Sequence, residues 1–168
     1  MKVKKIYFDM DGVLADFNRG IEELCGMKWG PQDEQGEESI ILMWSRAGKI
    51  PHFYDRLELK PGAKEMFDAV YERYGTRCEI LSAIPQPLRG MVGSAEDKKA
   101  WVKRLLSPDV TVNTVYREEK LDFCTGKDCI LIDDLRMNAE AWEALGGTAI
   151  LHRTAEETLQ KLKEMEIL

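Results

Sequence analysis

The sequence predicts an α/β fold built on a doubly wound parallel sheet of five strands. Two observations indicate this class. Five short runs rich in aliphatic and β-branched residues recur along the chain, and amphipathic helical patterns separate most of them. Continuous apolar runs are typical of strands that a parallel sheet buries on both faces. Strands that alternate with helices join through right-handed crossovers, which gives the doubly wound, Rossmann-like arrangement.

The expected strands and helices follow one another along most of the chain. The strand runs cover residues 4–11, 76–83, 110–116, 127–134 and 147–152. Helical patterns cover residues 61–75, 97–106 and 138–145, and a last helix opens with Thr154 and Glu157, a capping-box pair. Pro61 near the start and Gly75 just past the end are the usual boundaries of the first of these helices.

Residues 18–60 interrupt the alternation of strands and helices. They lie between the first strand and the helix before the second strand, and this segment is far longer than a simple crossover needs. The stretch 30–39 (GPQDEQGEES) is polar and acidic and contains glycine, which predicts a loop, and the sequences on both sides of it have helical patterns. We therefore expect residues 18–60 to form a small helical insertion over one end of the sheet. Residues 1–17 and 61–168 would form the core domain.

Composition and charge narrow the classes of partner. A chain of 168 residues is close to the length of one domain, roughly 150 residues. The net charge of -6 disfavours a nucleic acid polymer or an anionic membrane as partner. No apolar run is long enough to span a membrane, and no signal peptide precedes the first strand. We expect a cytoplasmic protein, either a monomer or a homodimer.

The four cysteines do not form a convincing zinc pattern. Cys124 and Cys129 have C-x4-C spacing, but no second cysteine pair follows, and both histidines are distant in sequence. Cys78 and Cys129 lie in apolar runs, where a buried thiol is the usual interpretation. No disulfide is expected in a reducing compartment.

Two carboxylates follow the first apolar run in the stretch DMDG. Asp9 and Asp11 are two residues apart, so along an extended strand their side chains point to the same side. Carboxylates placed in this way repel each other unless a cation or a proton lies between them. Mg²⁺, a hard cation that prefers oxygen ligands, would relieve the repulsion, and Gly12 would allow a sharp turn. The alternative is a solvated strand end.

A second acidic pair ends another apolar run, CILIDD. Asp133 and Asp134 repeat the pattern of Asp9 and Asp11. If the two strands are neighbours in the sheet, four acidic groups meet at the carboxyl edge, where open α/β sheets bind ligands. A fold does not tolerate such a concentration of charge without a metal or a function. The two pairs together therefore predict a metal site.

Ser82 and one of three lysines also qualify as phosphate ligands. Ser82 ends a third apolar run, and Lys120 follows a fourth, although Lys98 and Lys99 compete with Lys120 for the same role. Each also has a simpler interpretation, as a turn serine or a surface lysine. A P-loop is excluded, because position 121 before TGKD is leucine instead of the required glycine.

The ordered set DMDGVLADF, ILSA, a lysine and LIDD resembles the haloacid dehalogenase superfamily of phosphatases over nearly the whole chain. The segments HFYDRLELKPGA (52–63) and KKAWV (98–102) are similar to the 5'(3')-deoxyribonucleotidase group within it. The resemblance implies a Mg²⁺-dependent phosphomonoesterase that acts through an aspartyl-phosphate and favours nucleoside monophosphates. It also implies roles for these residues: Asp9 as nucleophile; Asp11 as general acid/base; Ser82, Ala83 and Lys120 as phosphate ligands; and Asp9, the Asp11 carbonyl, Asp133 and Asp134 as Mg²⁺ ligands.

The insertion resembles a cap that closes over the site in this superfamily. Phe17, which directly precedes the insertion, and the aromatic residues within it are candidates to stack on a nucleobase, and the alternative for those within it is that they form the core of the cap. They are Phe17, Trp29, Trp44 and Phe53, with Tyr54 as a further member.

Two other functions stay open. Ala83 and Ile84 stand where the nucleotidase group carries hydroxyl residues, so a different small phosphometabolite could be the substrate. A binding module without turnover is the other alternative. A receiver domain is excluded, because its acceptor aspartate lies on the third strand and the run VTVNTVY has none.

Overall fold

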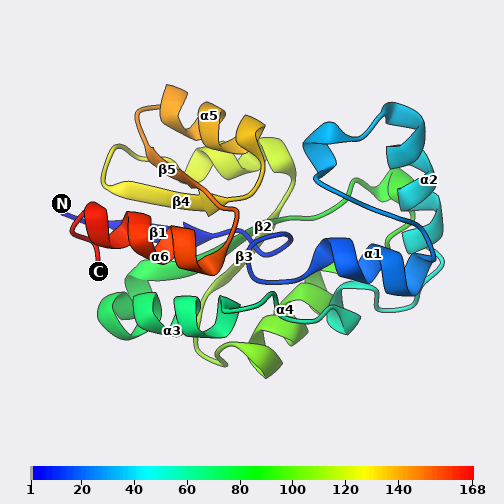
Figure 1. Ribbon diagram of the computed structural model, residues 1–168, viewed down its shortest axis with the longest axis horizontal. Helices are drawn as coiled ribbons and strands as arrows, with labels where there is room; N and C mark the ends of the chain where they lie inside the picture. Colours follow the sequence, from blue (N-terminus) through cyan, green and yellow to red (C-terminus); the bar gives the residue numbers. More distant parts are fainter. Residues whose placement is uncertain (1) are drawn as a thin grey trace.

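The computed structural model describes residues 2–168 and confirms the predicted fold class. Five parallel strands form one sheet in the order β3-β2-β1-β4-β5. β1 occupies the centre, so the stretch after it lies between the ends of β2 and β4 (Figure 1). The strands are β1 (Lys5–Phe8), β2 (Cys78–Ala83), β3 (Val112–Val115), β4 (Cys129–Asp133) and β5 (Thr148–Leu151).

Helices cover both faces of the sheet (Figure 1). The α-helices are α1 (Phe17–Cys25), α2 (Glu37–Ala47), α3 (Ala63–Tyr74), α4 (Ser94–Leu105), α5 (Arg136–Ala144) and α6 (Ala155–Glu164). Short 3-10 helices are η1 (Gln32–Glu34), η2 (Tyr54–Arg56), η3 (Gly75–Arg77), η4 (Pro87–Arg89) and η5 (Arg117–Phe123).

The central strands β1 and β4 are largely apolar because each face of the sheet meets a different layer. Ile6 and Phe8 of β1 point into the larger core, which α3, α4 and α6 cover. Tyr7 points to the opposite face, where its ring meets the edges of Phe123 and Trp142. Alternate residues of one strand therefore pack on opposite layers, as expected for a buried parallel strand.

The segment between β1 and α3 contains the predicted helices and lies beyond the carboxyl ends of the strands (Figure 1). The chain leaves and re-enters the core at one place, where the Asp16 amide donates to the Glu58 carbonyl and the Lys60 amide to the Leu14 carbonyl, both at 2.8 Å. This pairing holds the stretch after β1 against the returning chain. The division into a core and a cap stays a prediction.

Several element ends differ from the predicted ones. The helix expected from residue 97 begins at Ser94, directly after Gly93 in a left-handed conformation, and the helix expected from residue 138 begins at Arg136. The Thr154 side chain accepts from the Glu157 amide at 3.2 Å, so it caps α6. None of the helices within residues 2–168 has both the length and the apolar character to cross a membrane.

Candidate active site

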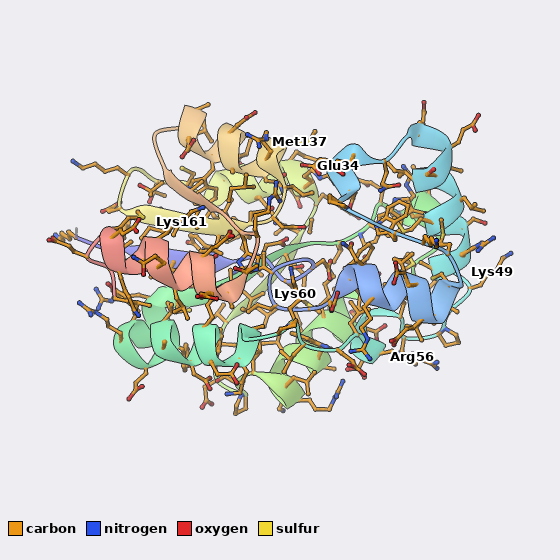
Figure 2. All side chains as sticks on the ribbon, viewed as in Figure 1. Glu34, Lys49, Arg56, Lys60, Met137 and Lys161 are labelled. Atoms are coloured by element: carbon orange, nitrogen blue, oxygen red, sulfur yellow. The ribbon has the colours of Figure 1, made fainter. Side chains whose placement is uncertain are left out.

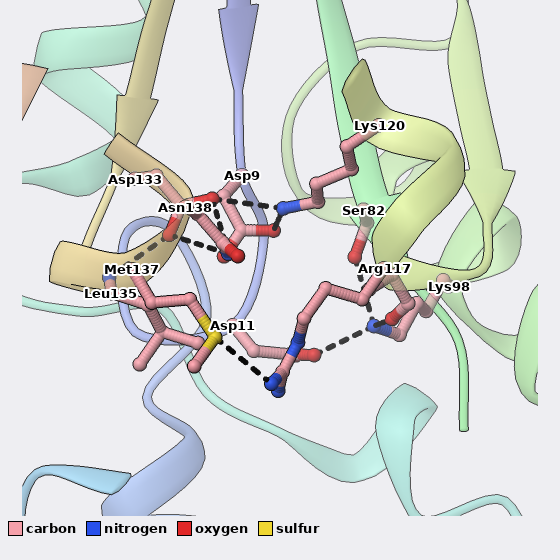
Figure 3. Close-up of polar contacts among 11 residues, drawn as sticks. Asp9, Asp11, Ser82, Lys98, Arg117, Lys120, Asp133, Leu135, Met137 and Asn138 are labelled. Carbon is pink, nitrogen blue, oxygen red and sulfur yellow. Dashed lines mark hydrogen bonds and ion pairs between the residues drawn. The ribbon is translucent and has the colours of Figure 1, made fainter. Parts of the chain in front are cut away.

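Three carboxylates meet at the carboxyl ends of β1 and β4, and Figure 3 shows two of them, Asp9 and Asp133. The two strands are neighbours, with Phe8 opposite Ile132, and the Asp9 amide donates to the Ile132 carbonyl at 2.9 Å. One oxygen from each of Asp9, Asp133 and Asp134 lies within 4.8 Å of the other two. The neighbouring strands therefore bring together acidic residues that are far apart in the sequence.

This proximity changes the ionisation of the carboxyl groups. Burial, together with the charges of Asp133 and Asp11, raises the pKa of Asp9 to about 7 against the opposing effect of Lys120. Burial also raises the pKa of Asp134 to about 8, with added contributions from Asp9 and Asp133. Groups that repel in this way bind a cation of high charge density well.

Lys120 balances part of the acidic charge. Its Nζ donates to Asp9 Oδ1 at 2.8 Å and to Asp133 Oδ2 at 2.9 Å, and the side chain is buried (Figure 3). Burial acts to lower the pKa of Lys120, but the Asp133 and Asp9 carboxylates raise it well above its usual value. The ammonium therefore stays charged beside both carboxylates.

Asp133 is held rigidly by the start of α5. Its oxygens accept from Asn138 Nδ2 at 3.0 and 3.2 Å, and Oδ1 also accepts from the Leu135 amide at 2.9 Å. A fully buried carboxylate needs such donors, because leaving its oxygens unpaired is unfavourable. Asn138 and Lys120 together fix the orientation of this group.

Asp11 lies beside a second buried lysine. Lys98 Nζ donates to Asp11 Oδ2 at 2.6 Å, Ser82 Oγ at 2.8 Å and the Ala83 carbonyl at 2.7 Å, which uses all three donors of the ammonium. The ammonium also lies 4.2 Å from the centre of the Tyr54 ring. Asp11 Oδ1 is buried and has no hydrogen-bond partner within residues 2–168.

The turn after Asp11 requires glycine. Gly12 has φ of +80°, and a Cβ atom there would lie 2.1 Å from Asp134 Oδ2. Lys60, near the centre of the molecule in Figure 2, donates from Nζ to the Gly12 carbonyl at 2.9 Å. The absent side chain thus allows Asp134 to approach the strand end, and Lys60 holds the turn in place.

A cavity of about 390 Å³ opens over these groups. The core and the insertion both contribute to its walls. From the core come Asp9, Asp11, Gly12, Ala83, Ile84, Pro85, Gln86, Arg89, Arg117, Glu118, Lys120, Asp134, Leu135 and Asn138, and from the first helix and the insertion come Phe17, Asn18, Gln32, Ile40, Trp44 and Tyr54.

Comparison with known proteins agrees with this architecture. No family model matches the chain. Over 142 residues the sequence is 30% identical to a candidate 5'(3')-deoxyribonucleotidase of Vibrio phage KVP40, with 84% of this chain and 71% of the phage protein covered. A haloacid dehalogenase superfamily hydrolase of Ehrlichia chaffeensis superposes with a TM-score of 0.61 at 13% identity, over 98% of each chain. The chain belongs to the haloacid dehalogenase superfamily.

A second solved member of the superfamily has the same fold. The enzyme of Bacteroides thetaiotaomicron, which was crystallised with magnesium and inorganic phosphate, superposes with a TM-score of 0.51 at 16% identity, over 90% of this chain and 94% of that one. The superfamily resemblance predicted from the ordered motifs is therefore confirmed, as is the similarity to the nucleotidase group through the phage relative.

The structure brings two of the three candidate lysines into the site, each with its own partners, and leaves Lys99 exposed. Lys120 contacts Asp9 and Asp133, whereas Lys98 contacts Asp11 and Ser82. Ala83 lines the cavity, and Ser82 lies fully buried beneath it against Lys98. The sequence presented the two lysines as competitors, but they occupy different places.

The five aromatic candidates divide into those that line the cavity and those that do not. Phe17 and Trp44 line the cavity, and their ring centres are 6.4 Å apart. Phe53 lies behind Phe17 with its ring edge-on at 5.8 Å, and neither Phe53 nor the buried Trp29 is part of the cavity wall. The structure therefore places Phe17 and Trp44, together with Tyr54, where a ligand could touch them.

Sequence reasoning missed Asn138 and the arginines of the cavity. Asn138 lies in the first turn of α5, five residues after Asp133, and a polar residue in the first turn after an acidic strand end was the available signal. Arg89 and Arg117 follow β2 and β3 at the same edge of the sheet, so their position after strand ends was a comparable signal.

Proposed function

We propose that the chain is a Mg²⁺-dependent phosphomonoesterase that releases phosphate from nucleoside monophosphates. The observation that carries the proposal is that Asp9, Asp11 and Asp134 line one cavity. Behind its wall, Asp133 completes the carboxylate cluster and Lys98 bonds to Asp11. Acidic groups alone would suggest a metal site. A second carboxylate held by its own lysine adds the proton-transfer group that hydrolysis needs.

Asp9 is the proposed nucleophile, since its carboxylate lies at the cavity floor and Lys120 holds one of its oxygens. Attack on phosphorus forms an aspartyl-phosphate while the bond to the leaving oxygen breaks. Asp11 donates a proton to that oxygen and then accepts one from the water that hydrolyses the intermediate. Lys98 holds Asp11 Oδ2, which leaves Oδ1 free for these transfers.

The donor set fits a Mg²⁺ ion. The carboxylates of Asp9, Asp133 and Asp134 offer only oxygen ligands. Burial and the acidic neighbours raise the pKa of Asp134, and a bound cation would relieve the repulsion between these carboxylates. When bound, Mg²⁺ neutralises negative charge on the phosphoryl oxygens. Asn138 keeps Asp133 in one orientation, as a residue behind a metal ligand does.

The proposed substrate follows from the cavity wall and from the phage relative. Phe17 and Trp44 present aromatic surface to the cavity, which suits a nucleobase. The volume of about 390 Å³ is within the usual range for small-molecule sites, about 300–1,000 Å³. The phage protein is a candidate nucleotidase. Residues 18–60 would act as a cap that closes over the leaving group.

A panel of phosphomonoesters assayed for phosphate release tests the proposal. We expect turnover of nucleoside monophosphates with Mg²⁺ and none in excess chelator, because the carboxylate cluster needs a cation. Phe17→Ala should reduce turnover of nucleotides more than turnover of a simple aryl phosphate. Equal rates with chelator would overturn the metal-dependent mechanism, and equal losses on both substrates would remove the base-stacking role.

A further inference from the structure

Two arginines line the cavity outside the catalytic cluster. Arg89 and Arg117 belong to η4 and η5, and neither forms an ion pair with a carboxylate within residues 2–168. The side-chain contact of Arg117 is with the Met137 thioether, from Nη1 to Sδ at 3.6 Å. By contrast, Lys98 and Lys120 already bond to site carboxylates.

The backbone at Arg89 is held in place. Pro87 is the first residue of η4, and the Arg89 amide donates to the Gln86 backbone carbonyl at 2.9 Å. Gly90 ends the turn in a left-handed conformation. A Cβ atom at Gly48 would lie 3.1 Å from the Arg89 carbonyl, so this turn packs closely on the end of α2. Arg89 therefore stands at a defined position on the cavity wall.

Arg117 is positioned by a capped turn. It is the first residue of η5, and the Glu119 side chain accepts from the Tyr116 amide at 2.7 Å, which fixes the start of that element. Figure 3 shows the Arg117 side chain extending from η5 toward Asp11 and Met137. The guanidinium thus extends from η5 toward Met137 in the first turn of α5.

The cavity wall outside the catalytic cluster has a net positive charge. Apart from Asp9, Asp11, Asp134 and Lys120, the charged residues of the wall are the two arginines and Glu118. A guanidinium presents a planar fork of donors that matches the oxygens of a phosphate. Two such groups without carboxylate partners suit an anion other than the phosphoryl group over Asp9.

We propose that Arg89 and Arg117 form a second phosphate subsite and that the preferred substrate is a phosphomonoester with a second phosphate group. For a nucleoside, this is a 3',5'-bisphosphate. The inference rests on the proposed function, because the first phosphate occupies the catalytic cluster. The second phosphate stays attached to the product and contributes binding.

Calorimetric titration with Mg²⁺ present tests the subsite without turnover. The Asp9→Asn protein is titrated with deoxythymidine 5'-monophosphate and with deoxythymidine 3',5'-bisphosphate. We expect the bisphosphate to bind at least about tenfold more tightly, as charge-assisted bonds to the partly buried Arg89 and the exposed Arg117 would give. The advantage should shrink in high salt. Equal affinity for the two ligands would overturn the subsite.

Variants in the same background identify the groups involved. Arg89→Gln and Arg117→Gln should each remove most of the bisphosphate advantage and leave the monophosphate affinity unchanged. Arg56→Gln is the matched control, because Arg56 is exposed, lies outside the cavity wall and is drawn at the outer surface in Figure 2. Equal losses for both ligands would place the arginines at the transferred phosphate and overturn the proposal.

Phosphate release by the unmodified chain separates this proposal from the proposed function. If neither nucleotide is hydrolysed but the bisphosphate still binds more tightly, the phosphatase activity fails and the subsite stands. If both are hydrolysed with equal affinity, the subsite fails alone. Cooperative thermal unfolding of each variant checks the fold, and Arg89→Lys and Arg117→Lys, which keep the charge but lose the fork, should retain only part of the advantage.

Discussion

Lys98 Nζ lies 2.6 Å from Asp11 Oδ2, although the two residues are 87 positions apart in the sequence. The same ammonium reaches Ser82 and the Ala83 carbonyl, so it joins the turn after β1 to the end of β2. The Tyr54 ring of η2 packs against it. The proposed acid/base group is therefore held by the core and by the returning end of the insertion at once.

Lys98→Met should reduce kcat/KM by about 100-fold or more, since removing one preorganised donor from an active site has effects of this size. Asp11 would lose its charged partner, and the buried Ser82 hydroxyl would lose its donor. Steady-state phosphate release measures the effect. Lys99→Met is the control, because Lys99 is the exposed neighbour in α4 and should be neutral. Equal activity of the two variants would contradict the role of Lys98.

Gly12→Ala should weaken the response to Mg²⁺ by about tenfold or more, because the new Cβ would displace the proposed metal ligand Asp134. Gly26→Ala is matched to it, since Gly26 also has positive φ but no atom within 4 Å of its Cβ position. Both variants should lose about 1–2 kcal/mol of unfolding free energy from the backbone conformation.

Urea unfolding and the Mg²⁺ concentration for half-maximal phosphate release separate these two effects. We expect only Gly12→Ala to raise the Mg²⁺ concentration needed for half-maximal phosphate release. A similar shift in Gly26→Ala would mean that backbone strain, instead of the contact with Asp134, is responsible.

Without divalent metal, the free energy of unfolding should fall as pH rises from about 4 to about 8. The pKa of Asp9 is raised to about 7 and that of Asp134 to about 8, chiefly by burial, from an ordinary value of 3.8. In this range the folded state holds protons that the unfolded state has released, so alkali favours unfolding. Mg²⁺ binds the ionised carboxylates, and its stabilising effect should grow over the same range.

Chemical unfolding at pH 5 and pH 8, with chelator or with Mg²⁺, measures how the free energy of unfolding and its increase by Mg²⁺ each change with pH. Asp134→Asn should flatten the decline in chelator and remove most of the Mg²⁺ effect. A Mg²⁺ effect of the same size at both pH values would contradict the ionisation scheme.

His152 should make the fold sensitive to acid. Burial lowers the pKa of His152 to about 3, with Lys60 and Arg153 contributing, and its Nδ1 lies 2.8 Å from Thr158 Oγ1. The unfolded state gains a proton on this residue below about pH 6.5 while the folded state stays neutral, so the contribution of His152 to the free energy of unfolding falls as pH drops toward 3 and opposes the contribution of the two carboxyl groups. His152→Gln should be less stable at neutral pH but lose less stability on acidification. An unchanged slope in the variant would exclude His152 as the cause.

The carboxylate cluster could be predicted from the sequence because it depends only on where parallel strands end. Parallel strands end at the same edge of a sheet, so acidic residues that close the runs of β1 and β4 meet once the strands are neighbours. The order of the motifs and the apolar runs carried that information.

The partners of the lysines could not be predicted in the same way. Lys98 and Lys120 come from α4 and η5, and their reach depends on how these elements pack. The aromatic residues of the insertion posed a similar problem. Phe17 lines the cavity while Phe53, which packs on it, faces the core, and helical periodicity does not separate these orientations in short elements.

The most direct test of the central claim is to trap the phosphorylated enzyme. The chain is mixed with Mg²⁺ and a nucleoside monophosphate, quenched in acid during turnover, and its peptides are analysed by mass spectrometry. We predict a phosphoryl group on Asp9 in the unmodified chain and none anywhere in Asp9→Asn, which should be folded but inactive. Phosphate release by Asp9→Asn at the unmodified rate, or a phosphoryl group on another residue, would contradict the account.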